Sequence, residues 1–365
     1  MTTDVLSLIL IPPLAAAHAS FWVILLTNLA YLRRQPEADL SDAPALSICI
    51  PARNEAENLR RLLPSLARQD YPEVEILVWD DGSEDDTWSV LQAAADDRVT
   101  PLRGADPPDG WVGKVHALYQ CTRVASGDCY LFLDADAELT RPDALRRLVA
   151  RHRGSGTSVS SGFPFLRGGG MLLVSLVPHA LLRSLPWPLV SRTENPSLSA
   201  LNGQCWLVDA QVYHTHEPHE HVKNDVLEDV AIGRYLKAKG HPPTLLDVQD
   251  LVSVYMYESY GAAWRGFRKN AYLLLGGTVP TFTLMYTGFV LTWVVAPLLS
   301  IWFAVSLYGL KLVTDRASGA SLTVSLLAPV SYLLGLALQL DSALHHWLGR
   351  VSWKGRSVPA SSPSS

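Results

Sequence analysis

The chain has 365 residues, with 30 Lys and Arg against 35 Asp and Glu, and its net charge is −5. This acidic balance excludes a protein that binds nucleic acid through a broad basic face. Hydrophobic residues make up 48% of the chain and charged residues only 18%, a composition that favours contact with a membrane. The length suffices for one globular domain of about 200–250 residues together with membrane segments.

The N-terminal segment predicts a membrane anchor, over residues 1–34. Val5 to Leu32 contains no Asp, Glu, Lys or Arg, and about 20 apolar residues are enough to cross a bilayer. Pro12-Pro13 is expected to kink this helix or to mark its start. A cleaved signal peptide is the alternative, but the segment is too long, has no basic leader and follows Asp4.

Residues 45–270 read as a soluble domain that follows a polar linker over residues 35–44. Apolar runs of strand length alternate with helical patterns, which predicts a Rossmann-like, mostly parallel α/β sheet. The expected strands are Leu46–Ala52, Val74–Trp79, Val99–Leu102 and Cys129–Leu133, and the expected helices are Ala56–Gln69, Asp85–Ala95, Lys114–Ala125 and Val230–Lys239.

Three polar clusters follow these strands, where ligands bind in sheets of this kind. Arg53-Asn54-Glu55 is the first and Asp80-Asp81-Gly82-Ser83 the second, and an ordinary capped turn is an equal alternative for the second. The third is Asp134-Ala135-Asp136. Two carboxylates delivered by a buried strand are costly unless a cation neutralises them, so we expect Mg²⁺ or Mn²⁺ there rather than a plain surface turn.

Two further places carry candidate site residues. Lys114 opens a helix after a turn-rich loop, so it can contact a diphosphate, although a solvated lysine is the alternative. Glu228-Asp229 also opens a helix, where acidic residues are commonly dipole partners, and a general-base role for Asp229 is the functional alternative.

The histidines and cysteines give weaker indications. His214, His216, His219 and His221 crowd one stretch, which we interpret as a polar loop at the mouth of the site rather than a zinc centre. The cysteines stand singly and are expected to be reduced, buried thiols of a cytosolic domain rather than disulfides or zinc ligands: Cys49, Cys121, Cys129 and Cys205.

The C-terminal region, residues 271–348, is expected to hold two more spans. Ala271–Leu310 and Ala317–Leu340 are uncharged runs. Gly276-Gly277 and Pro280 are expected to separate an interfacial piece from a spanning helix near Phe282–Leu307, or else the run holds a tight pair of helices. Three spans in total are therefore predicted.

Basic residues flank the first and the last expected span. Arg33 and Arg34 follow the first, and Arg350, Lys354 and Arg356 follow the last. The positive-inside rule then places the middle domain and the tail, residues 349–365, in the cytoplasm of a multi-pass protein of the inner or plasma membrane.

A fourth apolar stretch, Met171–Val190, is interrupted by His179, Arg183 and two prolines. We expect it to lie on the membrane as an interfacial amphipathic helix with Trp187 as its anchor, in preference to a core helix.

Six motifs in order resemble family 2 glycosyltransferases with the GT-A fold: PARNEAENL, VWDDGSEDDT, GWVGK, FLDADAEL, NGQCWL and LEDVAIGR. The resemblance spans residues 45–270. GWVGK, the C-terminal spans and WKGR at Trp353–Arg356 make the chain most similar to membrane enzymes that glycosylate hopanoids or carotenoids.

The resemblance implies a role for each matching residue. It places Asp134 and Asp136 at the metal and the diphosphate, and Asp229, beside Glu228, as the general base. The residues expected around the nucleotide-sugar are Pro51, Ala52, Arg53, Glu55, Asp80, Asp81, Lys114, Asp134, Ala135, Asp136, Arg265 and Arg268. Arg265 and Arg268 stand where processive relatives carry Q-x-x-R-W, a signature that is absent here.

The expected reaction is an inverting transfer from a nucleotide-sugar, such as UDP-glucose, to a hydroxyl or carboxyl of a lipid acceptor. A processive polysaccharide synthase, a polyprenyl-phosphate sugar transferase and a non-catalytic nucleotide-sugar-binding membrane protein are the alternatives. The first lacks the Q-x-x-R-W signature, and the last does not explain Asp134, Asp136 and Asp229 together.

Overall fold

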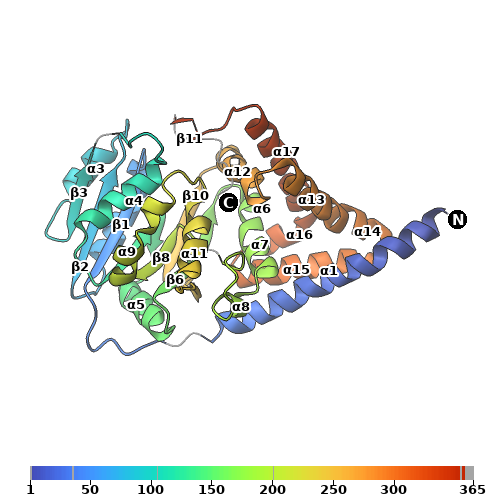
Figure 1. The fold of residues 1–365 in the computed structure, drawn as a ribbon, viewed down its shortest axis with the longest axis horizontal. Coiled ribbons are helices and arrows are strands. Elements are labelled where there is room, and N and C mark those ends of the chain that lie inside the picture. The colour runs from blue at the N-terminus through green and yellow to red at the C-terminus, as the bar shows by residue number, and fades with distance from the viewer. Residues whose placement is uncertain (1, 35–36, 105, 200, 354–355, 358–365) are drawn as a thin grey trace. The chain divides into compact units, whose positions relative to one another are not determined.

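The computed structural model describes residues 2–34, 37–104, 106–199, 201–353 and 356–357 (Figure 1). Part of the expected linker, residues 35–36, and most of the expected tail, residues 354–355 and 358–365, lie outside this description. Two compact units share the chain. The helical unit comprises Met1–Tyr31, Leu166–Pro186 and Met256–Ser365, and the sheet unit comprises Leu32–Phe165 and Trp187–Tyr255. This division differs from the expected boundary at residue 270.

The sheet unit is built on a seven-stranded sheet in the order β3-β2-β1-β4-β8-β6-β9. Pairing is parallel from β3 through β4, antiparallel on both sides of β8, and parallel again between β6 and β9. The strands are β1 (Leu46–Ala52), β2 (Val74–Asp80), β3 (Val99–Arg103), β4 (Cys129–Leu133), β6 (Val159–Phe163), β8 (Cys205–Asp209) and β9 (Thr244–Asp247). The predicted mostly parallel α/β sheet is confirmed, with β8 as its antiparallel member.

The apolar runs form strands because both faces of the sheet are covered. All five residues of β4 are buried, as are six of the seven in β1. The helices of this unit are α2 (Ala56–Ala67), α3 (Thr87–Ala94), α4 (Gly113–Val124), α5 (Ala144–Gly154), α8 (Trp187–Val190), α9 (Ala210–His216), α10 (Pro218–His221) and α11 (Glu228–Ala238). In α2, Leu59, Leu62, Leu63 and Leu66 are buried, as their helical spacing predicts.

Two short strands lie beside this sheet. β5 (Ala137–Leu139) pairs antiparallel with β10 (Val252–Tyr257), in register from Val252 opposite Leu139 to Val254 opposite Ala137. The backbone N–H of Tyr255 donates to the carbonyl of Asp136 at 2.9 Å. β10 therefore fixes the chain that leaves Asp134-Ala135-Asp136.

The helical unit contains the N-terminal helix, the C-terminal helices and a short central insertion. Its elements are α1 (Thr2–Leu32), α6 (Met171–Val174), α7 (Leu176–Ser184), α12 (Tyr260–Leu274), α13 (Val279–Val290), the π-helical turn η1 (Leu291–Val295), α14 (Ala296–Leu299), α15 (Ile301–Ala317), α16 (Leu322–Leu326), α17 (Ala328–Trp347) and the hairpin strands β11 (Ser352–Trp353) and β12 (Arg356–Ser357). The strand β7 (Phe165–Gly168) leads into it.

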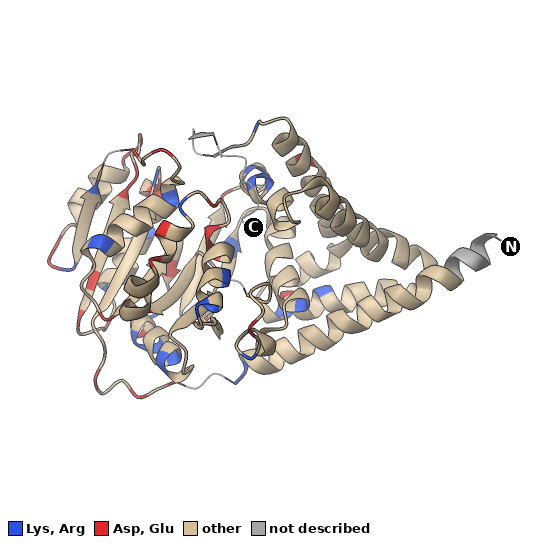
Figure 2. Ribbon diagram, in the orientation of Figure 1, with Lys and Arg blue, Asp and Glu red and all other residues tan. Residues whose placement is uncertain are grey.

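Two helical stretches are long and apolar enough to cross a membrane: Leu8–Leu32 and Val279–Leu299. Figure 2 shows α1, α13 and α14 almost without charged residues. The third predicted span, Ala317–Leu340, is not confirmed, since α16 and α17 divide it and α17 does not meet the same criteria.

The break at Gly276-Gly277 is confirmed, because both glycines have positive φ (95° and 64°) between α12 and α13. The single helix expected near Phe282–Leu307 is wrong. Ser300 is extended (φ −158°, ψ 136°), and its side chain accepts a hydrogen bond from the N–H of Trp302 at the start of α15. The apolar run therefore holds two helical pieces that meet at Ser300.

The Met171–Val190 segment forms three short helices, α6, α7 and α8, rather than one. Trp187 is buried in the sheet unit, so the expectation of an interfacial tryptophan anchor is wrong. In the helical unit, His179 of α7 is buried and hydrogen-bonds Thr314 of α15 at 2.9 Å and Tyr332 of α17 at 3.2 Å. The polar residues that interrupt this segment therefore face the interior of the helical unit.

A second polar group lies at the centre of this unit. Lys311 and Asp315 are both fully buried and form an ion pair one turn apart on α15. Ser175 accepts a hydrogen bond from Lys311 at 3.0 Å, and Ser325 donates one to Asp315 at 2.8 Å. Both charges thus have an ionic partner and a hydroxyl partner, as buried charges require.

Candidate active site

The loops after β1 and β2 meet because the two strands are parallel neighbours, with Ala52 opposite Asp80. Arg53 donates from Nη1 to the carbonyl of Asp81 at 2.6 Å and lies 4.0 Å from the Asp81 carboxylate. Asn54 (φ 53°) accepts from the N–H of Glu84, and its own N–H donates to Ser83. The structure therefore brings the Arg53 and Asp81 clusters together, as predicted.

Asp80 is fully buried, with one carboxylate oxygen in a hydrogen bond and the other in an ion pair. Oδ1 accepts from the N–H of Ser83 at 3.0 Å, and Oδ2 lies 3.1 Å from Nε of Arg103. Gly82 has φ 67° at this turn, a conformation that favours glycine. Asp80 and Asp81 were both expected around the nucleotide-sugar. Asp80 shapes the turn, so Asp81 is the better candidate for contact with the ligand. Arg103 was not anticipated, because nothing in its sequence context marks it.

Lys114 joins two elements that are far apart in the chain. Its Nζ lies 2.8 Å from Oδ1 of Asp134, after β4, and 3.1 Å from Oε1 of Glu228, at the start of α11. Lys114 itself is in the first turn of α4. Three candidate site residues that are 20 to 114 positions apart in the sequence therefore form one cluster.

Asp229 lies beside this cluster, and two backbone N–H groups hold its carboxylate. Its Oδ2 accepts from the N–H of Gly203 at 3.1 Å, and its Oδ1 accepts from its neighbour Val230 at 2.8 Å. A Cβ at position 203 would lie 3.2 Å from Nζ of Lys114 and 3.3 Å from Cβ of Asp229. Only a glycine lets the backbone approach both side chains this closely.

The loop at residues 202–204 connects the two acidic groups, because β8 starts beside the end of β4, with Cys205 opposite Leu133. The N–H of Asp134 donates to the carbonyl of Gln204 at 3.1 Å. Asn202 holds the loop by donating from Nδ2 to the carbonyl of Gly162 and accepting at Oδ1 from the N–H of Gln204, both at 3.1 Å. The NGQCWL motif marked this segment in the sequence, but no site role was predicted for Gly203.

Burial and charge set the protonation of the cluster. Burial and the negative charge of Glu228 raise the pKa of Asp229 to about 6, although the positive charge of Lys114 opposes the shift. Burial also raises the pKa of Asp134, although Lys114 opposes the shift. Burial alone would lower the pKa of Lys114, but Asp134, Glu228 and Asp229 raise it well above its usual value. Lys114 is therefore a fixed cation, and Asp229 titrates near neutral pH.

The carboxylates outnumber the cations here. Asp134, Glu228 and Asp229 share the single charge of Lys114, and the charge of Glu55 also reaches Asp134. Asp136 follows two residues later, with its Oδ1 buried. A surplus of carboxylate oxygens fits a hard divalent cation such as Mg²⁺ or Mn²⁺, for which Asp134 and Asp136 are the expected ligands.

Residues 47–216 match the family described as Glycosyl transferase family 2. This segment of the chain is therefore similar to family 2 glycosyltransferases. Two relatives, the 4,4'-diaponeurosporenoate glycosyltransferases of Staphylococcus aureus strains USA300 and NCTC 8325 / PS 47, are 29% identical over 247 residues. These matches cover 65% of this chain and 63% of each relative, so part of each relative's length has no counterpart in the match.

A solved structure shows the same fold. The mannosyltransferase PcManGT from Pyrobaculum calidifontis, in complex with GDP-Man and Mn²⁺, has a TM-score of 0.57 to this chain and 19% identity. The similarity covers 93% of this chain and 98% of that one. The expected GT-A-like fold is therefore confirmed.

The histidine-rich segment of the sheet unit is structural rather than a polar loop. It forms α9 and α10, and His219 is fully buried against Phe132, Trp206 and Tyr213, with its Nδ1 2.7 Å from the Tyr213 hydroxyl. Burial lowers the pKa of His219 to about 3, so it is neutral. His214 similarly hydrogen-bonds Tyr130 at 2.7 Å. The interpretation of this stretch as a loop at the mouth of the site is wrong.

Arg265 and Arg268 belong to the helical unit, outside the Lys114 cluster. Arg268 lies 3.7 Å from Asp341, whose carboxylate also accepts from Trp264 at 2.7 Å. Their expected contact with the diphosphate stays a prediction. The four cysteines are buried and form no disulfide, which agrees with the expected thiols.

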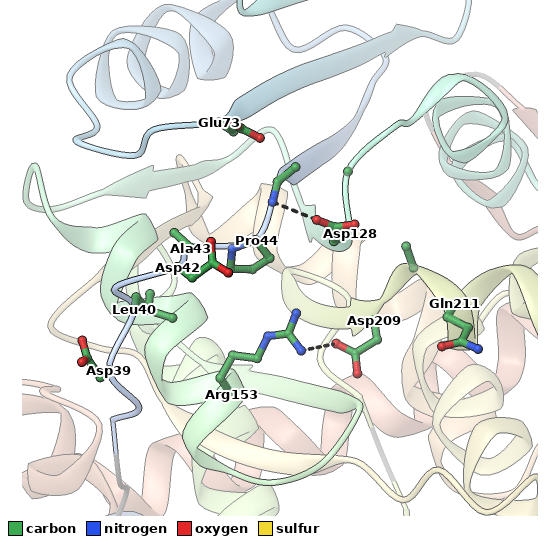
Figure 3. Close-up of a pocket in the computed structure, with 13 residues that line it drawn as sticks. Asp39, Leu40, Asp42, Ala43, Pro44, Glu73, Asp128, Arg153, Asp209 and Gln211 are labelled. Carbon is green, nitrogen blue, oxygen red and sulfur yellow. Dashed lines mark hydrogen bonds and ion pairs between the residues drawn. The ribbon is translucent and has the colours of Figure 1, made fainter.

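An open hollow of about 770 Å³ lies elsewhere on the sheet unit (Figure 3). Ala45 and Asp128, which precede β1 and β4, line it together with Asp209 at the end of β8. In Figure 3, Asp128 accepts from the N–H of Ala45, and Arg153 faces Asp209. The hollow is thus at the opposite ends of these strands from Asp134, and acidic side chains dominate it. It does not suit a diphosphate.

Proposed function

We propose that the chain is an inverting glycosyltransferase that moves a sugar from a nucleotide-sugar to a membrane-lipid acceptor. The observation that supports this most strongly is the convergence of Asp134, Glu228 and Asp229 on Lys114, within a family 2 domain. One buried carboxylate that titrates near neutrality, beside a fixed cation, suits a base that faces a departing diphosphate.

The proposed reaction is a single displacement. The acceptor oxygen attacks the anomeric carbon, the bond from that carbon to the diphosphate oxygen breaks, and its electrons leave with the nucleoside diphosphate. Asp229 takes the proton of a hydroxyl acceptor, and the N–H groups of Gly203 and Val230 orient its carboxylate. Lys114 offsets negative charge on the leaving group. A divalent cation held by Asp134 and Asp136 would supply further charge compensation to the diphosphate.

The loops after β1 and β2 are the proposed nucleoside pocket. Pro51, Ala52, Arg53 and Glu55 would line it, and Asp81 would accept a hydrogen bond from the base or ribose. Asp80, held by Ser83 and Arg103, would keep this turn in shape. The donor is proposed to be a UDP-sugar such as UDP-glucose.

The acceptor class rests on the relatives and on composition. The curated relatives are named for a carotenoid acid, diaponeurosporenoate. A carotenoid or hopanoid acceptor would reside in a bilayer, and two helical stretches of this chain are apolar enough to cross one. We propose a multi-pass protein of the plasma membrane whose glycosyltransferase domain is cytoplasmic, with Arg33 and Arg34 on that side.

The test uses membranes that contain the full chain, incubated with radiolabelled UDP-glucose or GDP-mannose and with a carotenoid alcohol or acid. Lipids are extracted and identified by mass spectrometry, which also separates a polyprenyl-phosphate product. A labelled glycolipid with the wild type, and none with Asp229→Asn on the alcohol acceptor, is expected. Equal labelling by both proteins would overturn the role of Asp229. Donor that stays intact in every arm would overturn the enzyme function.

An acceptor comparison sharpens the assignment of the base. A hydroxyl needs a base during attack, whereas a carboxylic acid has already lost its proton at neutral pH. Asp229→Asn should therefore reduce transfer to the alcohol far more than transfer to the acid. An equal loss on both acceptors would mean that Asp229 serves the donor.

A further inference from the structure

Arg183 is a buried cation without a carboxylate partner. Its side chain is 3% exposed, and within the described part of the chain it makes no hydrogen bond or ion pair. Its Nε in particular is buried and unpartnered. Burying a charge in this way is costly unless a counter-charge accompanies it.

Aromatic rings flank Arg183 on two sides. Its guanidinium carbon lies 4.4 Å from the ring centroid of Phe21 in α1 and 5.5 Å from that of Trp293 in η1. Cation–π contacts offset part of the cost of burial, but they leave the N–H donors of the guanidinium unused. Both rings belong to the stretches that are apolar enough to cross a membrane, Leu8–Leu32 and Val279–Leu299. An ionisable residue in such surroundings is a candidate functional site.

The neighbouring charges do not balance Arg183. Asp315, the buried acid of this unit, forms an ion pair with Lys311 and accepts a hydrogen bond from Ser325. The charge of Arg183 also reaches two histidines, His18 and His179, neither of which offers an anion. By sequence, the helical unit carries ten Lys and Arg against four Asp and Glu, whereas the whole chain has an acidic surplus. This unit therefore favours an anion from outside the chain.

The backbone beside Arg183 is irregular. Trp293 lies in η1, a single π-helical turn between two α-helical stretches, and such turns occur frequently at functional sites. A π-helical turn re-aims its side chains relative to an unbroken α-helix, and here it carries one of the two rings that hold the guanidinium.

We propose that Arg183 binds the anionic head, a carboxylate or a phosphate monoester, of an apolar-chain amphiphile. Arg presents a planar fork of donors that matches both anions. Phe21 and Trp293 would contact the first carbons of the chain, since aromatic walls suit an apolar ligand. The observations that support this site are independent of the catalytic cluster.

The experiment measures binding to the full chain in nanodiscs of uncharged lipid, without nucleotide-sugar. The probes form two matched pairs: cis-parinaric acid with its methyl ester, and lysophosphatidic acid with a monoacylglycerol. In each pair only the anion differs. The wild type is expected to bind at least one anionic probe about tenfold more tightly than its uncharged partner, the effect of one charge-assisted contact. The preferred pair identifies the head group as carboxylate or phosphate.

Two variants complete the test. Arg183→Met keeps an unbranched side chain as far as the position of Nε but removes the guanidinium. It should abolish the preference for the anion, while binding of the uncharged probe remains. Arg316→Met removes an exposed charge from the same unit and should keep the preference. Equal binding of the anionic and the uncharged probe in both pairs by the wild type would overturn the proposal, whether or not Arg183→Met folds. A preference that survives in folded Arg183→Met would also overturn it.

The outcome is separable from that of the catalytic proposal. If the wild type shows no anion preference but still synthesises glycolipid, only the Arg183 proposal is overturned. If the wild type binds the anionic probe but transfers no sugar, only the proposed reaction is overturned.

Discussion

The backbone N–H of Gly203 donates to Oδ2 of Asp229 at 3.1 Å, and the same glycine leaves room for Lys114. One residue without a side chain therefore positions both the proposed base and the proposed diphosphate cation.

Gly203→Ala should reduce turnover by roughly 10- to 100-fold, because a small displacement of aligned reacting groups is costly. The new Cβ would be 3.2 Å from Nζ of Lys114 and 3.3 Å from Cβ of Asp229, so one of them must move. Steady-state kinetics should show the loss mainly in kcat. Gly288→Ala, where a Cβ meets nothing within 4 Å, is the matched control. Wild-type kcat in Gly203→Ala would contradict the proposed geometry.

The activity on a hydroxyl acceptor should fall as the pH drops through about 6, the pKa of Asp229. The base acts only when deprotonated, so below this pKa kcat/KM should decrease about tenfold per pH unit. The charge of Glu228 raises the pKa of Asp229, so Glu228→Gln should move this acidic limb to lower pH. A pH–rate profile measures both. A limb that stays in place in Glu228→Gln would argue against this coupling.

Lys114→Met should move the same limb to higher pH, because Lys114 lowers the pKa of Asp229. It should also reduce kcat by roughly 100- to 1000-fold, the usual loss when a charge that stabilises a leaving group is removed. The variant leaves Asp134 and Glu228 without their shared cation, so its thermal unfolding must be recorded beside its kinetics. A loss of kcat without any shift of the acidic limb would contradict the electrostatic effect of Lys114 on the pKa of Asp229.

Asp136→Asn should weaken activation by Mn²⁺ at least about tenfold, since an amide is a poorer ligand for a hard cation than a carboxylate. Titration of sugar transfer with Mn²⁺ in chelator-treated membranes gives the apparent affinity. Asp97→Asn replaces an exposed aspartate of the same domain and serves as the control. Activity of the wild type that is unaffected by chelation would contradict a metal at this position.

Asp315→Asn should destabilise the helical unit by about 3–5 kcal/mol, because it leaves the buried charge of Lys311 without its partner. Unfolding in detergent, followed by tryptophan fluorescence, measures the change. Replacing both partners, with Lys311→Met and Asp315→Leu together, should cost less than the single change. A double variant that is less stable than Asp315→Asn would show that the pair itself is strongly stabilising.

The first four strands of the main sheet in chain order could be predicted from the sequence. β1, β2, β3 and β4 are short apolar runs bounded by turn residues. A polar cluster follows each of β1, β2 and β4, and parallel pairing then fixes its position. Asp134 and Asp229 could be proposed as site residues by resemblance, and the structure brings both to Lys114. β6, β8 and β9 were not predicted, since serine and glycine interrupt β6 and local pattern does not reveal an antiparallel strand inserted beside β4.

The membrane region was harder to predict for a different reason. In the uncharged run from Ala271 to Leu310, Pro297 precedes Ser300 by three residues, yet a single spanning helix was expected through both. The helix ends at Ser300, whose side chain accepts a hydrogen bond from the N–H of Trp302 at the start of α15. Trp187 likewise follows an apolar stretch but lies in the core of the sheet unit. Burial in a tertiary fold and exposure to lipid favour the same residue types, so composition alone does not separate them.

The loop at residues 202–204 contacts Asp134 through Gln204 and Asp229 through Gly203. Chimeras built to change acceptor preference must therefore keep this loop, β4 and the start of α11 from a single parent. A crossover point inside it would mismatch the two sides of the reaction centre even if each half folded correctly. Crossovers placed before Cys129 or after Ala238 would avoid that failure.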